Sequence, residues 1–354
     1  MKVLYKRDTT GKIRSWGLEL DGDKYRTYSG LVDGSLTISG WTVAVAKRGT
    51  TPEQQAALEV AADYKKKLAL NYFETLAEID NETFFEPMLA HKYEKWQGVC
   101  YSQPKLDGIR CIAKKDGLWS RKGKPFVAVP HIMQVLQGFF KDYPDAVLDG
   151  ELYNHDLRSD FNKICSVVKK MKPDAADLTV SAGLIQYHIY DIWTPDSHGF
   201  DVRTVMLRNL IISKEPIVLV PTSLASSETE LDQMYGVYLG FGYEGQIVRN
   251  QTGVYENKRS NNLLKRKEFK DGEFKILAVE EGLGNWAGVA KKVVLELPDG
   301  REFGAGIKGN REDALILLND RDKYIGKMAT VRYFTETPDG IPRFPVVYNM
   351  DRTA

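Results

Sequence analysis

The sequence lacks a large excess of one charge, a cysteine framework and a long apolar run. Its 49 basic and 48 acidic residues leave a net charge of +1, so any nucleic-acid surface must come from local clustering of Lys and Arg. Cys100, Cys111 and Cys165 are odd in number and have no C-x-x-C spacing, which argues against a disulfide framework or a zinc site. We expect all three thiols to be reduced.

Two further absences concern membranes and targeting. No charge-free apolar run of about 18 residues occurs, and the N-terminal stretch Met1-Lys2-Val3-Leu4 lacks the apolar core of a signal peptide. We therefore expect no membrane partner. At 354 residues the chain exceeds the usual size of a single core, so we expect two or three domains.

The first 84 residues predict a small β-rich module. Short β-like stretches over 3–7, 13–20, 24–29 and 35–46 are separated by Gly and Asp, and Pro52 begins a helix that runs to Leu68. A mixture of basic and aromatic residues could hold a nucleic-acid backbone, although an ordinary sheet with an aromatic core fits equally well. The mixture consists of Lys6, Arg7, Lys12, Arg14, Lys24, Arg26, Lys47, Arg48, Trp16, Tyr25, Tyr28 and Trp41.

Six short motifs follow one another between residues 105 and 267. A strand over 96–102 should lead into Lys105, which would place this amine at a strand end, where a loop can present it to a ligand. In chain order the motifs are KLDGIR (105–110), SRKG (120–123), LDGEL (148–152), IYDIW (189–193), YEGQIVR (243–249) and LLKRK (263–267).

Taken together and in this order, the motifs resemble those of ATP-dependent DNA ligases, most closely the compact viral and bacteriophage type. The resemblance implies an α+β fold whose nucleotidyltransferase (adenylation) domain, of antiparallel sheets with helices, spans 85–269. The β-rich residues 270–354, with one helix over 311–319, fit a C-terminal OB-fold barrel. Residues 1–84 form the remaining module, a candidate for DNA binding.

Lys105 is the nucleophile that the resemblance implies. Its amine would attack the α-phosphorus of ATP, expel pyrophosphate and keep AMP as a phosphoramidate. Since an unperturbed lysine has a pKa of ~10.4, nearby cations must favour the neutral amine. Lys265 and Lys267 alternate in a predicted strand and would both point toward the α-phosphate. Asp107 would orient Lys105 or support the later sealing step, and both roles stay open.

Two carboxylates, Glu151 and Glu244, fit a magnesium site, in which Mn²⁺ could replace Mg²⁺. We expect both at strand ends, each beside a glycine that lets a phosphate approach; Glu151 could instead hold the ribose hydroxyl. The resemblance implies that adenine stacks on Tyr190. Gln103 stands where many relatives carry Glu, and its oxygen could accept from the adenine amino group. Because an amide also donates, the preference for ATP would be less strict.

The arginines are assigned to phosphates. Arg110 and Arg121 carry planar guanidinium groups suited to the 5′-phosphate at a nick, and Arg110 also belongs to the expected ATP site. Arg249 could be only a strand-end cation. Arg343 and Arg352 lie in a tail that is similar to the terminal ligase motif, which orients pyrophosphate, although a structural tail is equally compatible.

The function predicted from the sequence is an ATP-dependent DNA ligase that seals nicks in duplex DNA through lysine-AMP and 5′-adenylated DNA. We expect a monomer in the cytoplasm, that of the host cell if the chain is viral. One alternative keeps the lysine chemistry in an RNA ligase or an mRNA-capping guanylyltransferase. Another is a catalytically silent nick-binding protein.

Overall fold

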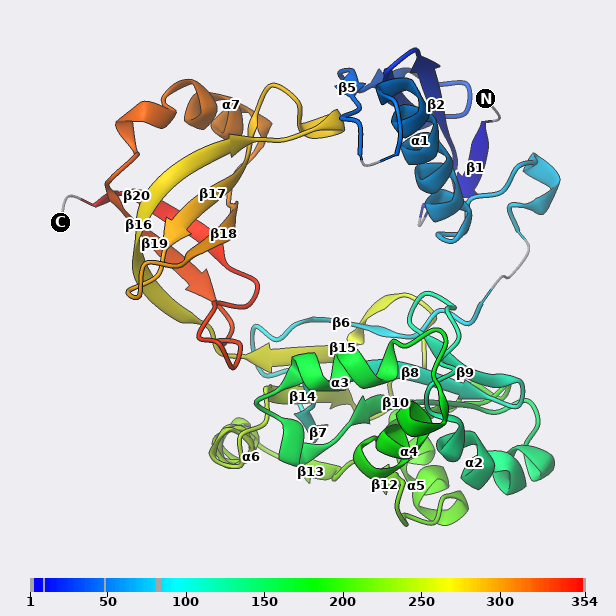
Figure 1. Cartoon of the computed structure of the whole chain (residues 1–354). Helices are drawn as coiled ribbons and strands as arrows, with labels where there is room; N and C mark the ends of the chain where they lie inside the picture. The colour runs from blue at the N-terminus through cyan, green and yellow to red at the C-terminus, as the bar shows by residue number, and fades with distance from the viewer. Residues whose placement is uncertain (1–2, 9, 48, 81–83, 353–354) are drawn as a thin grey trace. The chain divides into compact units, whose positions relative to one another are not determined.

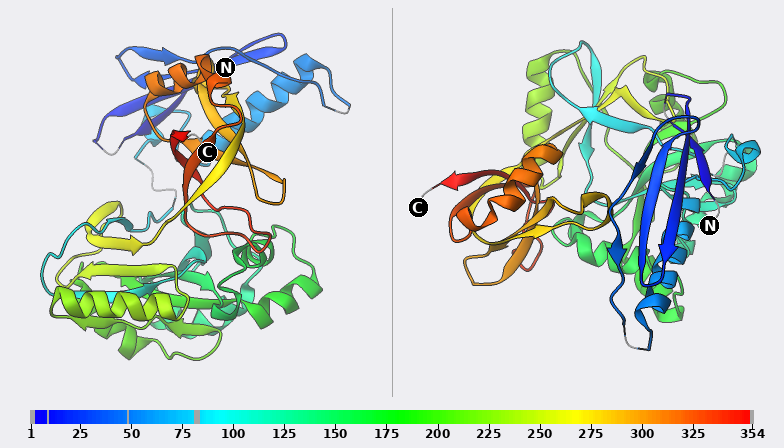
Figure 2. Two further views of the ribbon diagram at one scale, coloured as in Figure 1. Left: turned by 90° about the vertical axis from the view of Figure 1, so that its left-hand side faces the viewer. Right: turned by 90° about the horizontal axis from the view of Figure 1, so that it is seen from above.

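The computed structural model describes residues 3–8, 10–47, 49–80 and 84–352, except for the side chains of residues 285, 351 and 352. Its ribbon is shown in Figures 1 and 2. The chain forms two compact units, one of residues 84–268 and one that contains residues 1–83 and 269–354. Within the described ranges, no helix has both the length and the apolar character needed to cross a bilayer.

The N-terminal module is an antiparallel sheet with one helix against it. Thr51 caps helix α1 in a reciprocal capping box with Gln54, which confirms the predicted helix start. Its core packs Leu4, Trp16 and Val60 together. The elements are β1 (Leu4–Arg7), β2 (Ile13–Asp21), β3 (Lys24–Leu31), β4 (Leu36–Ile38), β5 (Thr42–Val43), α1 (Pro52–Leu68) and the 3₁₀ turn η1 (Leu76–Glu78).

The stretch predicted as one strand over 35–46 is two short strands, β4 and β5, both paired with β3. The Ser39 hydroxyl accepts a hydrogen bond from the Thr27 backbone N–H and donates to the Gly40 carbonyl. Between β4 and β5, the Ser39 side chain therefore makes hydrogen bonds to the backbone that a continuous strand would make itself.

The unit of residues 84–268 contains two five-stranded sheets, ordered β12-β11-β10-β8-β9 and β13-β7-β14-β15-β6. The strands are β6 (Leu89–Lys92), β7 (Cys100–Lys105), β8 (Ile109–Lys114), β9 (Gly117–Ser120), β10 (Val147–Tyr153), β11 (Gln186–Trp193), β12 (Ile217–Leu219), β13 (Ser223–Ala225), β14 (Gly245–Asn250) and β15 (Arg259–Lys267). The helices are α2 (Pro130–Asp142), η2 (His155–Leu157), α3 (Phe161–Val168), α4 (Ala175–Leu184), α5 (Phe200–Leu210) and α6 (Glu228–Gly240).

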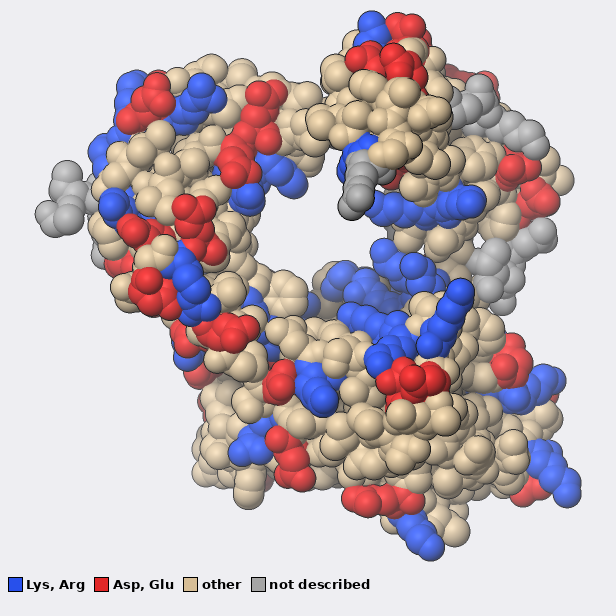
Figure 3. Space-filling model, in the orientation of Figure 1, with Lys and Arg blue, Asp and Glu red and all other residues tan. Residues whose placement is uncertain are grey.

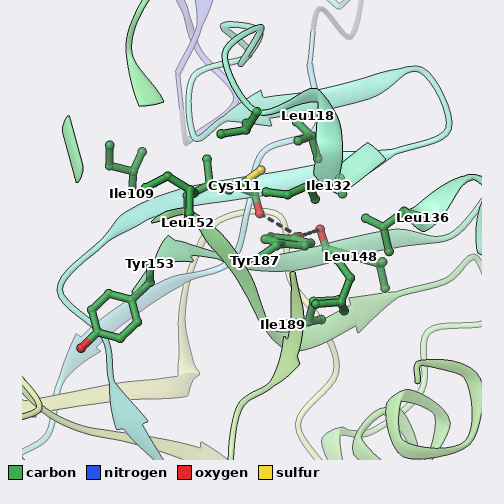
Figure 4. Packing of buried hydrophobic residues seen from close by; sticks show 14 of the residues in the cluster. Ile109, Cys111, Leu118, Ile132, Leu136, Leu148, Leu152, Tyr153, Tyr187 and Ile189 are labelled. Carbon is green, nitrogen blue, oxygen red and sulfur yellow. Dashed lines mark hydrogen bonds between the residues drawn. The ribbon is translucent and has the colours of Figure 1, made fainter. Parts of the chain in front are cut away.

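Each sheet has its own core. Residues of α2, α3 and α5 pack against β8, β10 and β11, whereas α6 packs against the other sheet. Figure 4 shows part of the first core, in which Tyr187 is fully buried. Its hydroxyl lies 2.9 Å from the Leu148 carbonyl and 3.1 Å from that of Cys111, so one phenol joins three neighbouring strands.

Two strand boundaries differ from the prediction. β7 begins at Cys100 rather than at residue 96, because turns precede it and Gly98 has φ +108°. Lys105 nevertheless ends this strand, as predicted. β10 continues from Val147 to Tyr153, so Glu151 lies inside a strand rather than at its end. Pairing with β8 on one side and β11 on the other keeps this stretch extended.

Residues 270–352 form the predicted barrel, closed in the order β16-β17-β18-β20-β19. Its core contains Ile276, Val293, Leu295 and Val331. The C-terminal strand β20 was not predicted, since this segment was interpreted only as a motif or tail. The elements are β16 (Lys270–Glu281), η3 (Gly284–Trp286), β17 (Ala290–Glu296), β18 (Glu302–Ile307), α7 (Arg311–Asn319), η4 (Arg321–Lys323), β19 (Met328–Tyr333) and β20 (Val346–Arg352).

The Tyr187 hydroxyl supports the first sheet, so we expect Tyr187→Phe to lower the free energy of unfolding by about 1 kcal/mol. Urea unfolding followed by circular dichroism measures this change. Tyr143→Phe is the control, because the Tyr143 residue is 43% exposed. Equal midpoints for wild type and Tyr187→Phe would contradict this role of the hydroxyl.

Candidate active site

A pocket of about 340 Å³ lies between the two sheets of the 84–268 unit. It is lined by residues of β6, β7, β14 and β15 from one sheet and of β8, β10 and β11 from the other. Eight residues singled out from the sequence line it together: Gln103, Lys105, Arg110, Arg121, Glu151, Tyr190, Arg249 and Lys265.

Strand register explains why distant lysines meet. Gly245 of β14 is paired with Lys105 of β7 on one side and with Lys267 of β15 on the other. Two residues along, Ile247 is paired in the same way with Gln103 and Lys265. Since side chains two residues apart share a face, both rows point to the same side of the sheet. This arrangement confirms that Lys265 and Lys267 face the same way.

Glu244 lies between two of these ammonium groups. Its Oε2 contacts Lys105 Nζ, and its Oε1 lies 3.1 Å from Lys267 Nζ. The Glu244 side chain is only 6% exposed, and its backbone N–H donates to the Lys105 carbonyl over 3.0 Å. One nearly buried carboxylate therefore positions both lysines.

The third lysine of the site, Lys265, has a lowered pKa because it is partly buried and because other cations lie nearby. Burial lowers the pKa of Lys265, and the positive charges of Lys267 and Lys105 lower it further. Arg259, the first residue of β15, acts in the same direction and also lines the pocket. Lys265 and Arg259 thus add positive charge to the pocket that Lys105 also lines.

Glu151, in contrast to the lysines, is a partly buried carboxylate near other negative charges. Burial raises the pKa of its carboxyl to about 8, and the negative charges of Glu244 and Asp149 add to the rise. Lys105 and Arg110 act against it. The Tyr190 hydroxyl lies 3.4 Å from Glu151 Oε2. Near neutral pH this carboxyl binds a proton or needs another cation.

Arg110 is held by a carboxylate that the sequence analysis did not assign. Its Nε lies 2.8 Å from Asp149 Oδ1, and its Nη2 contacts the other oxygen of Asp149. The Tyr255 hydroxyl donates to Asp149 over 2.7 Å. The Asp149 side chain is 1% exposed and that of Arg110 is 19% exposed, so the guanidinium keeps an open edge toward the pocket.

Two guanidinium groups lie close to the Tyr190 ring. Arg110 is 5.6 Å and Arg249 is 5.5 Å from the centre of its ring. The ring lines the pocket, where its position is compatible with stacking of a base.

Gln103 is fixed by a buried network. Its Nε2 donates to the Tyr190 carbonyl over 3.1 Å and to the Thr222 hydroxyl over 2.8 Å, and its Oε1 accepts from Arg249 Nε over 2.7 Å. Both amide hydrogens and one oxygen lone pair are thus used within the protein. Gln103 retains one lone pair for the adenine amino group, so its predicted contact with the base stays a prediction.

Arg249 is more than a strand-end cation. It is 2% exposed, lines the pocket and donates from Nη1 to Asp191 Oδ2 over 2.5 Å. Arg203 donates to the same carboxylate. Burial alone would raise the pKa of Asp191, but Arg249 and Arg203 outweigh it and hold that pKa below its usual range. Two buried arginines share one aspartate, which leaves a net positive charge beside Gln103.

Arginines also gather at the edge of the pocket. Arg121 follows β9, and burial lowers its pKa, as do the charges of Arg110 and Arg259. Figure 3 shows Lys and Arg side chains collected on the surface of this unit over β6, β8 and β9. This surface is suited to an anionic ligand larger than the pocket itself.

The loop after Lys105 fits tightly against β10. A Cβ on Gly108 would lie 2.5 Å from the Leu152 carbonyl and 2.8 Å from Glu151 Cγ, so this position excludes larger residues. Asp107 is half-buried in the same loop. Burial raises the pKa of the Tyr153 phenol, and the Asp107 charge adds to that rise.

The glycines beside the two glutamates do not open a path for phosphate, contrary to the prediction. A Cβ on Gly150 would lie 2.5 Å from the His188 carbonyl and 2.6 Å from the Tyr187 ring. A Cβ on Gly245 would lie 2.2 Å from the Arg266 carbonyl. Protein atoms fill both spaces, so these glycines are required by packing.

Two predicted residues belong to the barrel. Arg343 lies between β19 and β20, 5.6 Å from the centre of the Phe344 ring. The side chain of Arg352, at the end of β20, lies outside the described residues. Their expected roles stay predictions.

The sequence analysis missed Asp149, Asp191, Arg203 and Arg259. The first two stand inside the motifs LDGEL and IYDIW, so their place in a motif was an available signal. Arg203 and Arg259 stand outside the six motifs, and their importance follows only from the contacts above.

Known proteins share this arrangement of domains. Residues 87–267, a little more than half of the chain, match the family model described as ATP dependent DNA ligase domain. Residues 281–350 match the one described as DNA ligase OB-like domain. These segments leave residues 1–86 outside both models.

Individual proteins similar to this chain are also DNA ligases. A DNA ligase of Haemophilus influenzae is 27% identical over 264 residues, which cover 73% of this chain and 89% of that protein. A DNA ligase of Enterobacteria phage T6 is 25% identical, over 68% of this chain but only 62% of its own length. A solved structure of a Lig E DNA ligase is 25% identical, with a TM-score of 0.61, over 75% of this chain and 98% of its own.

The two paired sheets, the lysine pocket and the barrel define a covalent nucleotidyltransferase with an OB domain. More narrowly, the chain belongs to the ATP-dependent DNA ligases, as the resemblance indicated. The predicted fold class is thereby confirmed, and the two alternative functions are not favoured.

The raised pKa of Glu151 has a consequence for stability. Between an unfolded pKa near 4.5 and a folded pKa of about 8, the folded protein binds more protons than the unfolded chain. The free energy of unfolding should therefore fall as pH rises from 5 to 8, by on the order of 1 kcal/mol per pH unit from this group. Glu151→Gln should remove this slope. Thermal melts of both proteins from pH 5 to 9 measure it, and parallel profiles would contradict the assignment.

Proposed function

We propose that this ligase works through Lys105 as its nucleophile and seals nicks in duplex DNA as a monomer. The observation that carries the assignment is the contact of Lys105 with Glu244, which Lys267 also contacts, at the rim of a pocket lined by Tyr190. We further propose domain boundaries at 1–84, 85–269 and 270–354.

In the first step, a bond forms between Lys105 Nζ and the α-phosphorus of ATP while the bond to pyrophosphate breaks. The amine must first lose a proton, and Glu244 is the carboxylate in contact with Nζ that can accept it. Lys265 and Arg259 line the pocket and Lys267 contacts Glu244 beside Lys105, so these cations would stabilise the negative charge that builds up on the phosphate oxygens. Tyr190, whose ring lines the pocket, would stack on adenine.

In the second step, the AMP group passes from Lys105 to the 5′-phosphate of a nick, so the N–P bond breaks as a pyrophosphate linkage forms. In the third, the 3′-hydroxyl attacks that 5′-phosphate and releases AMP. Arg121 at the pocket edge, beside the open side of Arg110, fits the nick phosphate. Asp107 remains the candidate that orients Lys105 or supports the third step.

The proposal includes Mg²⁺ between Glu151 and Glu244, with Mn²⁺ as a substitute. The described residues contain no group of three or more His, Cys, Asp or Glu that could hold a metal, but Mg²⁺ keeps several waters and needs only one or two carboxylates. The Glu151 carboxyl, whose pKa is about 8, is short of positive charge, which a cation would supply. The ion would neutralise phosphate charge, while Glu244 is balanced by Lys105 and Lys267 in its absence.

The assignment of Lys105 is tested with ATP labelled at the α-phosphate. Lys105→Ala should lose self-labelling completely but still seal a nick that already carries 5′-AMP, because the third step does not use the amine. Lys115→Ala, in an exposed turn, is the control and should label like wild type. Labelling of Lys105→Ala at the wild-type level would refute the assignment. Labelling of wild type by GTP and not by ATP would favour the capping alternative.

The metal site is tested by proton release. Since a bound cation favours the carboxylate, Mg²⁺ should displace up to about one proton from Glu151 at pH 7. Titration calorimetry in two buffers of different ionisation enthalpy measures this number, with ATP present and absent. Glu151→Gln should release no such proton. Equal release from both proteins would place the cation elsewhere.

A further inference from the structure

Several basic side chains of the N-terminal module gather near the Tyr72 ring, where Lys6 Nζ also donates to the Leu70 carbonyl over 2.9 Å. Lys6 of β1 is directly opposite Arg14 of β2, and like charges in this position destabilise a sheet. Lys6 Nζ lies 5.9 Å from the centre of the Tyr72 ring, and Lys67 Nζ lies 4.8 Å from the same centre. Two ammonium groups therefore share one ring.

Helix α1 adds the lysines of its last turn to the basic side chains near Tyr72. It ends in Lys65, Lys66 and Lys67, which favourably oppose the negative end of the helix dipole. The dipole does not explain why Lys67 lies over Trp16, 4.8 Å from its ring centre, as well as over Tyr72. Lys67 is half-buried there, and burial lowers its pKa, as do the charges of Lys66 and Lys6.

Few negative charges balance this group. Asp63 is the acidic residue that acts on Lys67, and Asp8 Oδ2 lies 3.5 Å from Arg14 Nε. Asp8 also accepts backbone hydrogen bonds from Thr10 and Lys12, so it is shared. Elsewhere on the module, Lys24 and Arg26 lie over Trp41 but are each paired with a carboxylate, Asp21 and Glu19 respectively.

We infer that Lys6, Arg14, Lys66 and Lys67 form a phosphate-binding surface that contacts the backbone of duplex DNA. Mutually repelling cations gain most from an anion that lies between them, and phosphates along a strand supply several at short intervals. Trp16 is only 5% exposed, and Lys6 and Lys67 both lie near the half-buried Tyr72 ring, so little aromatic surface is left for unpaired bases to stack on. Contact with the backbone of a duplex fits this surface better than contact with a single strand.

This inference rests on the proposed function in one respect, namely that duplex DNA is the substrate. It adds a second region of contact, in the residues that neither ligase family model covers. Because the surface belongs to the module and Lys105 does not, it should affect DNA binding without affecting transfer of AMP to the protein.

The test uses the full-length protein and a fluorescent nicked duplex, with Kd measured from 50 to 200 mM NaCl. Each phosphate contact contributes about 0.9 to the slope of log K against log salt. Lys66→Gln/Lys67→Gln should reduce that slope by about 1 to 2 and weaken binding on the order of tenfold at 100 mM salt. Lys24→Gln/Arg26→Gln removes the same number of charges from the same module and should leave the slope unchanged.

A second, single variant distinguishes the loss of a DNA contact from a loss of folding. Lys66 is exposed, so Lys66→Gln alone should keep the wild-type melting temperature and still reduce the slope by about 1. An unchanged slope in Lys66→Gln and in the double variant would overturn the inference, as would a loss of affinity confined to single-stranded DNA. Self-labelling by ATP separates the two proposals, since its absence from wild type would count against the proposed function alone.

Discussion

The catalytic unit depends on one nearly buried carboxylate, Glu244, that lies between Lys105 and Lys267. Three adjacent strands meet at this point, and without the carboxylate two ammonium groups would face each other in a partly dry pocket. Truncating one member of such a group leaves a buried charge without compensation, which costs several kcal/mol. The same contact keeps Lys105 in place, and the amine must leave it before it can attack a phosphorus atom.

A second buried network, at the end of the pocket where Gln103 lies, balances the charges of two arginines against one aspartate. The network that joins Gln103, Arg249, Asp191 and Arg203 is almost completely buried. With a neutral amide at position 103, two guanidinium groups rely on one carboxylate. The amide also donates to the Tyr190 carbonyl, which a glutamate could not do. The Gln103 amide therefore holds the backbone of the strand that carries Tyr190.

Much of this structure follows from local patterns. Alternation predicted that Lys265 and Lys267 share a face, and the Thr51-Pro52 start predicted α1. The six motifs contribute Lys105, Arg110, Glu151, Tyr190 and Lys265 to the pocket, whereas Gln103 and Arg259, which also line it, lie outside them. What local patterns could not supply is the pairing of distant strands. Glu151 was expected at a strand end, but pairing with β8 and β11 keeps its strand extended on both sides.

The sequence analysis missed the buried ion-pair partners because they come together only through the packing of separate strands and helices. Nothing in the sequence around Asp149 or Asp191 says which arginine each will meet, since Arg203 and Arg249 reach Asp191 from different elements. Glycine was interpreted as an opening for phosphate, whereas at Gly150 it is required because the Tyr187 ring packs there. Sequence identifies chemical groups, and three-dimensional packing decides which of them remain available to a ligand.

The connection between the two units is very short. β15 ends at Lys267 and β16 begins at Lys270, so only Glu268 and Phe269 separate a residue that contacts Glu244 from the first strand of the barrel. The strand that carries Lys265 and Lys267 is thus almost continuous in sequence with the first strand of the barrel. An insertion or deletion at this junction would act directly on the end of a strand that lines the pocket.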